Sequence, residues 1–137
     1  MQANRQDLHT SIGLLILRVG LGGYMLTHGF SKLQKVLDGQ FDKFADPIGI
    51  GSGPSLVMIT FAEFGCALLV MAGLATRLAA IPLVIGMAVA ALVFHADDPW
   101  TMAQASNGSK EPALMYLFAF ATLIFTGAGQ FSLDRMA

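Results

Sequence analysis

The chain has 137 residues, of which 55% are hydrophobic and only 12% are charged. Soluble domains carry about 25% charged residues, so this chain has too few polar groups to cover a soluble domain of its size. The formal net charge is −1 and the basic residues are scattered, which excludes the basic patch of a nucleic-acid-binding protein. This composition argues against a cytosolic globular enzyme and a disordered chain, and it favours an integral membrane protein.

Four apolar runs in the sequence are long enough to cross a bilayer as helices, since a spanning helix needs about 20 apolar residues. They cover residues 11–30, 56–75, 78–95 and 112–130. Acidic residues, lysine and arginine are almost absent from them: the first run contains only Arg18 and the second only Glu63. The sequence therefore predicts an all-α fold, an integral membrane four-helix bundle, as a single domain over residues 1–137.

The connections between these runs differ in length. Only Thr76 and Arg77 separate the second run from the third, which predicts a tight antiparallel hairpin. In residues 31–55, apolar side chains at positions 33, 36, 37, 41 and 44 recur at helical spacing among charged ones. We expect a short amphipathic helix here, on the membrane surface after the first spanning helix. Residues 96–111 predict a polar loop with an interfacial Trp100.

An even number of spans places both termini on the same side of the membrane. The positive-inside rule does not assign that side, because the terminal side carries three basic residues and the loop side four. These residues are Arg5, Arg77 and Arg135 on the terminal side, and Lys32, Lys35, Lys43 and Lys110 on the loop side. Acidic residues gather in the two long loops, so we expect those loops outside and the termini in the cytoplasm.

Several polar side chains fall at a similar depth near the long loops. At the helical rise, His28 and His95 each lie about 25 Å along parallel helices, and Glu63 lies about 10 Å from the same side. Tyr116 is one turn into the fourth helix, and Lys32 follows His28 on the same helix face. Because ionisable residues inside a membrane tend to face the bundle interior, we expect these five side chains to converge on one pocket.

Such a cluster allows three interpretations. Imidazoles and a carboxyl group in an apolar site can exchange protons beside a quinone, whose oxygens need protons on reduction. Two histidines and a glutamate can instead ligate a metal ion, although no closely spaced ligand pair supports this. In the third interpretation the cluster is structural, with the histidines bound to water and Glu63 paired with Lys32.

Arg18 lies near the opposite, terminal side, roughly 10 Å deep. It can satisfy the unpaired carbonyl groups at the end of the fourth helix, or pair with Asp134 near the same surface. Either contact would give Arg18 a role in fixing the fold. Cys66 is the only cysteine, which excludes an intramolecular disulfide, and we expect it to be a small packing residue.

Four groups of residues then form a recognisable pattern over residues 11–135. They are Leu17-Arg18-Val19-Gly20-Leu21-Gly22, His28-Gly29-Phe30-Ser31-Lys32-Leu33, Ala62-Glu63-Phe64-Gly65 with Gly73-Leu74-Ala75-Thr76-Arg77-Leu78-Ala79-Ala80, and Gly127-Ala128-Gly129-Gln130-Phe131-Ser132-Leu133-Asp134. Together they resemble the DoxX family of small four-helix membrane proteins. The resemblance implies that Arg18, His28, Lys32, Glu63, Arg77 and Asp134 occupy motif positions. Gln130 departs from the basic residue that the family often has there.

The resemblance also implies a function, since named family members are linked to the small subunit of thiosulfate:quinone oxidoreductase. We expect a small integral subunit or accessory of a quinone-linked oxidoreductase in the plasma membrane, with other redox subunits or further copies of itself as partners. A quinone is the expected ligand, and the chain shows no intrinsic cofactor or metal motif. The expected catalytic residues are Glu63, His28 and His95, and the expected ligand contacts are Arg18, Lys32, Tyr116 and Arg77. The alternative is a non-catalytic membrane scaffold or assembly factor.

Overall fold

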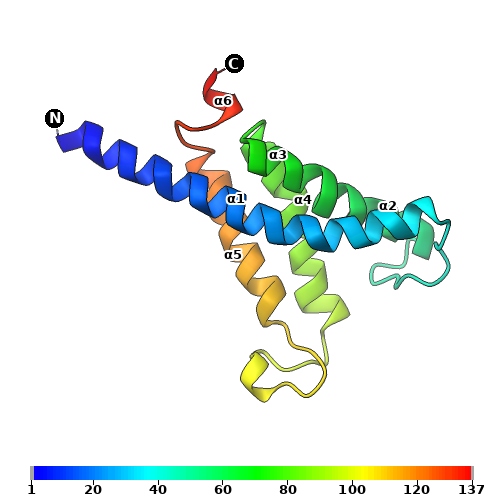
Figure 1. The fold of residues 1–137 in the computed structure, drawn as a ribbon. Helices are drawn as coiled ribbons and strands as arrows, with labels where there is room; N and C mark the ends of the chain where they lie inside the picture. The colour runs from blue at the N-terminus through cyan, green and yellow to red at the C-terminus, as the bar shows by residue number, and fades with distance from the viewer. Residues whose placement is uncertain (1, 137) are drawn as a thin grey trace.

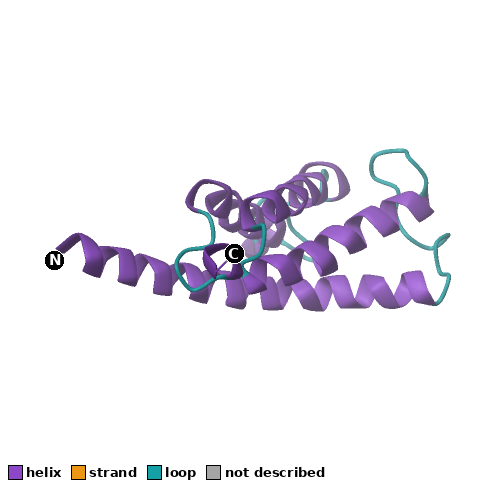
Figure 2. Cartoon of the chain, turned by 90° about the horizontal axis from the view of Figure 1, so that it is seen from above, coloured by secondary structure: helices purple, strands orange, loops and turns teal. Residues whose placement is uncertain are grey.

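The computed structural model describes residues 2–136, which fold into helices joined by loops (Figure 1). The elements in chain order are α1 (Gln2–Leu37), α2 (Ser52–Thr60), η1 (Phe61–Cys66), α3 (Ala67–Ala72), α4 (Thr76–Val89), η2 (Ala90–Phe94), η3 (Met102–Gln104), α5 (Glu111–Thr126) and α6 (Leu133–Met136). Two of them, η1 and η2, are π-helices, and η3 is a single 3₁₀ turn. No strand occurs within residues 2–136 (Figure 2), so the predicted all-α fold is confirmed.

Three helical segments are long and apolar enough to cross a membrane: Asp7–Leu37, Ser52–Ala72 and Thr76–Phe94. The fourth apolar helix, α5, has 16 residues, which gives a length of about 24 Å. The predicted span of 112–130 is therefore too long at its C-terminal end. The helix stops at Gly127, where φ is 72° and ψ is −164°, a backbone conformation that glycine adopts without strain.

The first helix is much longer than the predicted span of 11–30. Its 36 residues extend about 54 Å, well beyond a hydrocarbon core of about 30 Å. The separate amphipathic helix predicted within residues 31–55 does not form. Residues 31–37 instead continue α1, which ends where Gly39 takes a left-handed conformation with φ 69°. Phe41 and Phe44 lie in the turns that follow.

The antiparallel hairpin between the second and third spans is present, but its turn is Gly73–Ala75 rather than Thr76–Arg77. Thr76 and Arg77 already belong to α4. Gly73 closes α3 in a left-handed conformation with φ 72°, the usual role of a glycine directly after a helix. Ala75 is also left-handed, with φ 48°, which is uncommon for a residue with a side chain.

The helices are arranged as two antiparallel pairs (Figure 1). One pair is α1 beside the continuous α2–η1–α3 segment, and the other is α4 beside α5. The pairs meet around the α3–α4 hairpin and diverge towards the long loops. The bundle is therefore closed at the end near the termini and open at the end near the long loops.

Small residues make the close helix contacts of the core. Ala67, Ala80 and Ala91 are fully buried between the helices. The closest approach is at Gly29 of α1, where an added Cβ would lie 2.4 Å from the carbonyl carbon of Glu63. The backbones of α1 and η1 therefore touch at this point, which only glycine permits.

Candidate functional site

A cavity of about 1020 Å³ lies at the open end of the bundle. Its walls come from α1, the α2–η1 segment, α4, η2 and α5, and from the two long loops, and most of them are apolar. The polar side chains in the lining are His28, Lys32, Ser55, Glu63, His95, Ser109 and Tyr116. The five side chains that the sequence predicts to converge therefore line one cavity.

Glu63 and Lys32 form an ion pair in this cavity. The Glu63 side chain is only 6% exposed and the Lys32 side chain 20% exposed, so the pair is largely shielded from solvent. Glu63 belongs to η1, and π-helical turns occur frequently at functional sites because the wider turn redirects a side chain. Together, η1 and the contact at Gly29 fix the carboxylate opposite Lys32.

His28 and Tyr116 meet across the cavity from α1 and α5. Their rings pack edge to face, with centroids 6.1 Å apart and an interplanar angle of 83°. Tyr116 is also stacked against the buried Phe120, with centroids 6.1 Å apart. The aromatic contacts hold the tyrosine ring in place on the cavity wall.

His95 lies at the end of η2, on the opposite helix pair from Glu63. Its Nδ1 lies 2.5 Å from Oδ2 of Asp98, three residues further along the chain. Lys110 steadies this loop, since its Nζ donates hydrogen bonds to the carbonyl oxygens of Ala96, at 2.8 Å, and Asp98. Asp98 was not among the predicted site residues. Its position three residues after His95 could have indicated the contact between the two side chains.

Asp46 is a second residue that the sequence reasoning missed. Its carboxylate accepts hydrogen bonds from the backbone N–H groups of Ile50 (3.0 Å) and Gly51 (2.8 Å), and from the Ser55 hydroxyl (2.9 Å). Loss of hydration raises the pKa of Asp46, but these hydrogen bonds outweigh it and the net pKa is lowered. Asp46 thereby shapes the turn that delivers α2 to the cavity.

The cavity is open in part to the outer surface of α2, η1, α4 and η2. Several of its lining residues are apolar and are also exposed on the outer surface of these four elements: Val57, Met58, Phe61, Ile85 and Phe94. The outer surface of a membrane-spanning segment faces lipid, so this opening faces the acyl chains. A lipid-soluble molecule can therefore enter without passing through water.

The metal interpretation of the cluster finds no support. Within the part of the chain that the structure describes, no three side chains of histidine, cysteine, aspartate or glutamate lie close enough together to hold a metal ion. His95 is engaged by Asp98, and Glu63 by Lys32. The ligand set proposed from two histidines and Glu63 is therefore not assembled.

Arg18 lies at the closed end of the bundle, away from the cavity, and is fully buried. Its guanidinium donates hydrogen bonds to the carbonyl oxygens of Val70 (3.3 Å) and Met71 (3.2 Å) at the end of α3, and to that of Phe131. The carbonyl contacts predicted for Arg18 are thus mainly to α3 rather than to the fourth helix. Arg18 is not among the residues that line the large cavity, so the structure does not bring it together with the predicted catalytic residues.

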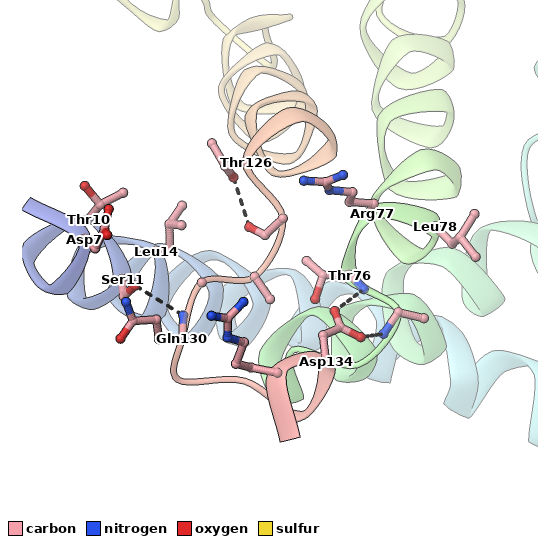
Figure 3. A pocket seen from close by; sticks show the side chains of 15 residues that line it. Asp7, Thr10, Ser11, Leu14, Thr76, Arg77, Leu78, Thr126, Gln130 and Asp134 are labelled. Carbon is pink, nitrogen blue, oxygen red and sulfur yellow. Dashed lines mark hydrogen bonds between the residues drawn. The ribbon is translucent and has the colours of Figure 1, made fainter. Parts of the chain in front are cut away.

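A second, smaller pocket of about 650 Å³ lies beside the termini (Figure 3). Arg77 and Asp134 line it. Arg77 donates a hydrogen bond of 3.4 Å to the carbonyl oxygen of Phe125, in the last turn of α5, so it too lies outside the large cavity. Asp134 accepts hydrogen bonds from the backbone N–H groups of Ala75 (2.6 Å) and Thr76 (3.0 Å), and thereby caps the N-terminus of α4.

Asp134 should make the stability of the fold depend on pH. Partial burial raises its pKa, but the hydrogen bonds from Thr76 and Ala75 and the charge of Arg18 outweigh it, so the net pKa is lowered. Stabilisation by such a carboxylate is complete above its unfolded-state pKa and is lost as the pH falls below about 4. We expect the Tm of the wild-type protein in detergent to fall more steeply between pH 5 and 3 than the Tm of Asp134→Asn, which lacks the capping charge.

The exposed Asp38→Asn variant is the control for this measurement, and it should follow the wild-type curve. Parallel Tm curves for wild type and Asp134→Asn would contradict the capping role of the carboxylate.

A comparison with protein-family models finds a match to the model described as DoxX, over residues 13–96. The matched region contains α1 from residue 13 onwards, the α2–η1–α3 segment and α4 with η2, and ends next to His95. No curated protein and no solved structure matches the chain.

Proposed function

The chain belongs to the DoxX family, and from this membership and its cavity we propose that it is a small integral membrane subunit or accessory of a quinone-linked oxidoreductase complex. The cavity is the proposed quinone site. The observation that carries the proposal is the shielded Lys32–Glu63 pair in an otherwise largely apolar cavity that opens towards lipid.

The lining of the cavity fits the chemistry of a quinone. Its volume of about 1020 Å³ is large enough for a drug-sized ring compound with part of a tail. The Lys32 ammonium group can donate a hydrogen bond to a ring carbonyl, and the Glu63 carboxylate can accept one from a ring hydroxyl. A bound quinone supplies the electron-transfer chemistry, and the apolar walls exclude water from it.

The proposal includes a location and partners. We place the protein in the plasma membrane, with the termini in the cytoplasm and the long loops outside. One contact supports placing both termini on the same side: the C-terminal segment lies against the N-terminal half of α1, with the Gln130 N–H 3.2 Å from the Ser11 hydroxyl. Electrons for a quinone would come from another redox subunit, since this chain offers no cofactor motif of its own.

Glu63→Gln tests the proposal with little change of shape. Without the carboxylate, the flexible Lys32 side chain is free to turn towards water at the loop surface. We expect the affinity for decylubiquinone, measured by titration calorimetry in mild detergent, to fall about tenfold, because a hydrogen bond to a charged group contributes about 1.5–3 kcal/mol. Quinone-dependent turnover of the parent complex should be lost while assembly is retained.

The exposed Asp38→Asn variant is the matched control, because it removes a carboxylate outside the cavity. Unchanged decylubiquinone affinity in Glu63→Gln would exclude the site. In that case the scaffold alternative would take precedence, since it predicts that Glu63→Gln has no effect on ligand binding or on association with the complex.

A further inference from the structure

We infer that the cavity has a second polar contact point, made by His95 and Ser109, and that its ligand carries polar groups at both ends of an apolar body. This inference rests on the proposed function, because it concerns the same cavity. The inference adds two requirements to the proposed function: the ligand must carry two separate polar groups, and Ser109 must be a binding residue. Ser109 lies outside the segment that matches the family model.

The first observation is the Ser109 hydroxyl. Ser109 lines the cavity and is 6% exposed, and its Oγ is buried with no hydrogen-bond partner within the part of the chain that the structure describes. A buried hydroxyl without a partner is costly, and most such groups in proteins are satisfied. An oxygen of a ligand in the cavity would satisfy it.

The second observation is the state of the His95 ring. Nδ1 is already engaged by the Asp98 carboxylate, so in the neutral imidazole Nδ1 carries the proton and Nε2 is the remaining acceptor. His95 lines the same cavity as Ser109. Gly108, next to Ser109, lies close to the ring, since a Cβ there would be 3.7 Å from Cε1 of His95. The two residues therefore form one polar group on the wall of the cavity.

The position of this group determines the shape of the ligand. Lys32 and Glu63 approach the cavity from the α1 and α2–η1–α3 pair, whereas His95 and Ser109 lie on the loop that joins the other pair. The two helix pairs diverge at this end (Figure 1), and the two polar groups therefore belong to different walls of the cavity. A para-quinone, with two oxygens on opposite sides of its ring, matches this arrangement, whereas a phenol with a single oxygen reaches only one of the two groups.

The test compares two probes with the full-length protein in mild detergent: decylubiquinone, which has two ring carbonyls, and 4-decylphenol, which has one oxygen. We expect Ser109→Ala to weaken decylubiquinone binding about fivefold to tenfold, the effect of one lost hydrogen bond. Binding of 4-decylphenol should not change in Ser109→Ala. Ser106→Ala, an exposed serine of the same loop, is the control and should leave both affinities unchanged.

The outcomes separate this inference from the proposed function. If Glu63→Gln weakens decylubiquinone binding and Ser109→Ala does not, the cavity binds quinone through one end only and the inference is wrong. Equal weakening of both probes by Ser109→Ala would also overturn it, because the effect would then be general loosening of the loop. If neither probe binds the wild-type protein, both the inference and the proposed function fail.

Discussion

Replacing Arg18 by methionine is expected to destabilise the protein by about 3 kcal/mol or more, because it removes three hydrogen bonds from a charged donor. Methionine nearly fills the same volume, so the loss comes from hydrogen bonding rather than from a large void. Burying a guanidinium is itself unfavourable, and removing it recovers part of this loss. A hydrogen bond to a charged group contributes about 1.5–3 kcal/mol, so the loss of these hydrogen bonds should dominate.

Unfolding in mixed micelles with increasing sodium dodecyl sulfate provides the measurement. Arg77→Met is the control, since Arg77 is exposed and its hydrogen bond to Phe125 is long, at 3.4 Å. We expect the control to lose less than about 1 kcal/mol. An Arg18→Met variant as stable as the wild type would contradict the role assigned to Arg18 in joining α3 to the C-terminal segment.

Replacing Gly29 by alanine should both destabilise the bundle and impair the cavity. The added Cβ would lie 2.4 Å and 2.5 Å from the carbonyl carbon and oxygen of Glu63, and these are backbone atoms that cannot move aside alone. α1 and η1 must then separate, which we expect to cost about 3 kcal/mol. The separation also pulls the Glu63 carboxylate away from Lys32, so decylubiquinone affinity should fall together with Tm.

Gly20→Ala is the matched control on the same helix. No neighbouring atom lies within 4 Å of a Cβ at Gly20. Alanine favours the helix by about 1 kcal/mol over glycine, so this variant should be as stable as the wild type or slightly more stable. If Gly29→Ala resembled Gly20→Ala in Tm and in affinity, the close contact between α1 and η1 would not be needed for either property.

The existence of the four apolar helices could be predicted from sequence, because the length of an apolar run reports directly on the thickness of the bilayer core. Their ends could not, since hydropathy does not mark where a helix stops. α1 continues through polar residues at both ends until Gly39, and α5 stops early at Gly127. Gly73 was a visible signal for the end of α3, because glycine is the usual residue directly after a helix.

The convergence of Glu63, His28, His95, Lys32 and Tyr116 was also predictable, because depth along a helix follows from the rise per residue. The two π-helices were not predictable in this way. A single inserted residue rotates one part of a helix against the other without changing its apolar composition. The proposed role of Ser109 depends on how the 96–110 loop folds back on the cavity. The spacing of apolar residues does not predict the path of such a loop.

The family motifs divide between the two ends of the molecule. Arg18, Gly73 and Asp134 meet at the closed end, where the guanidinium passes over Gly73 and Asp134 caps the next helix. A Cβ at Gly73 would lie 2.3 Å from Nη1 of Arg18. Lys32 and Glu63 meet at the open end, in the cavity. One set of motif residues thus holds the hairpin and the C-terminal segment together, and the other lines the proposed site.

Native mass spectrometry of the protein, extracted in mild detergent from its own membranes, tests the proposed quinone site most directly. We predict an adduct with the mass of a membrane quinone on the wild-type protein, its loss in Glu63→Gln, and its retention in the Asp38→Asn control. Wild-type protein without any quinone adduct, or an adduct that Glu63→Gln retains in full, would contradict the assignment of the cavity as a quinone site.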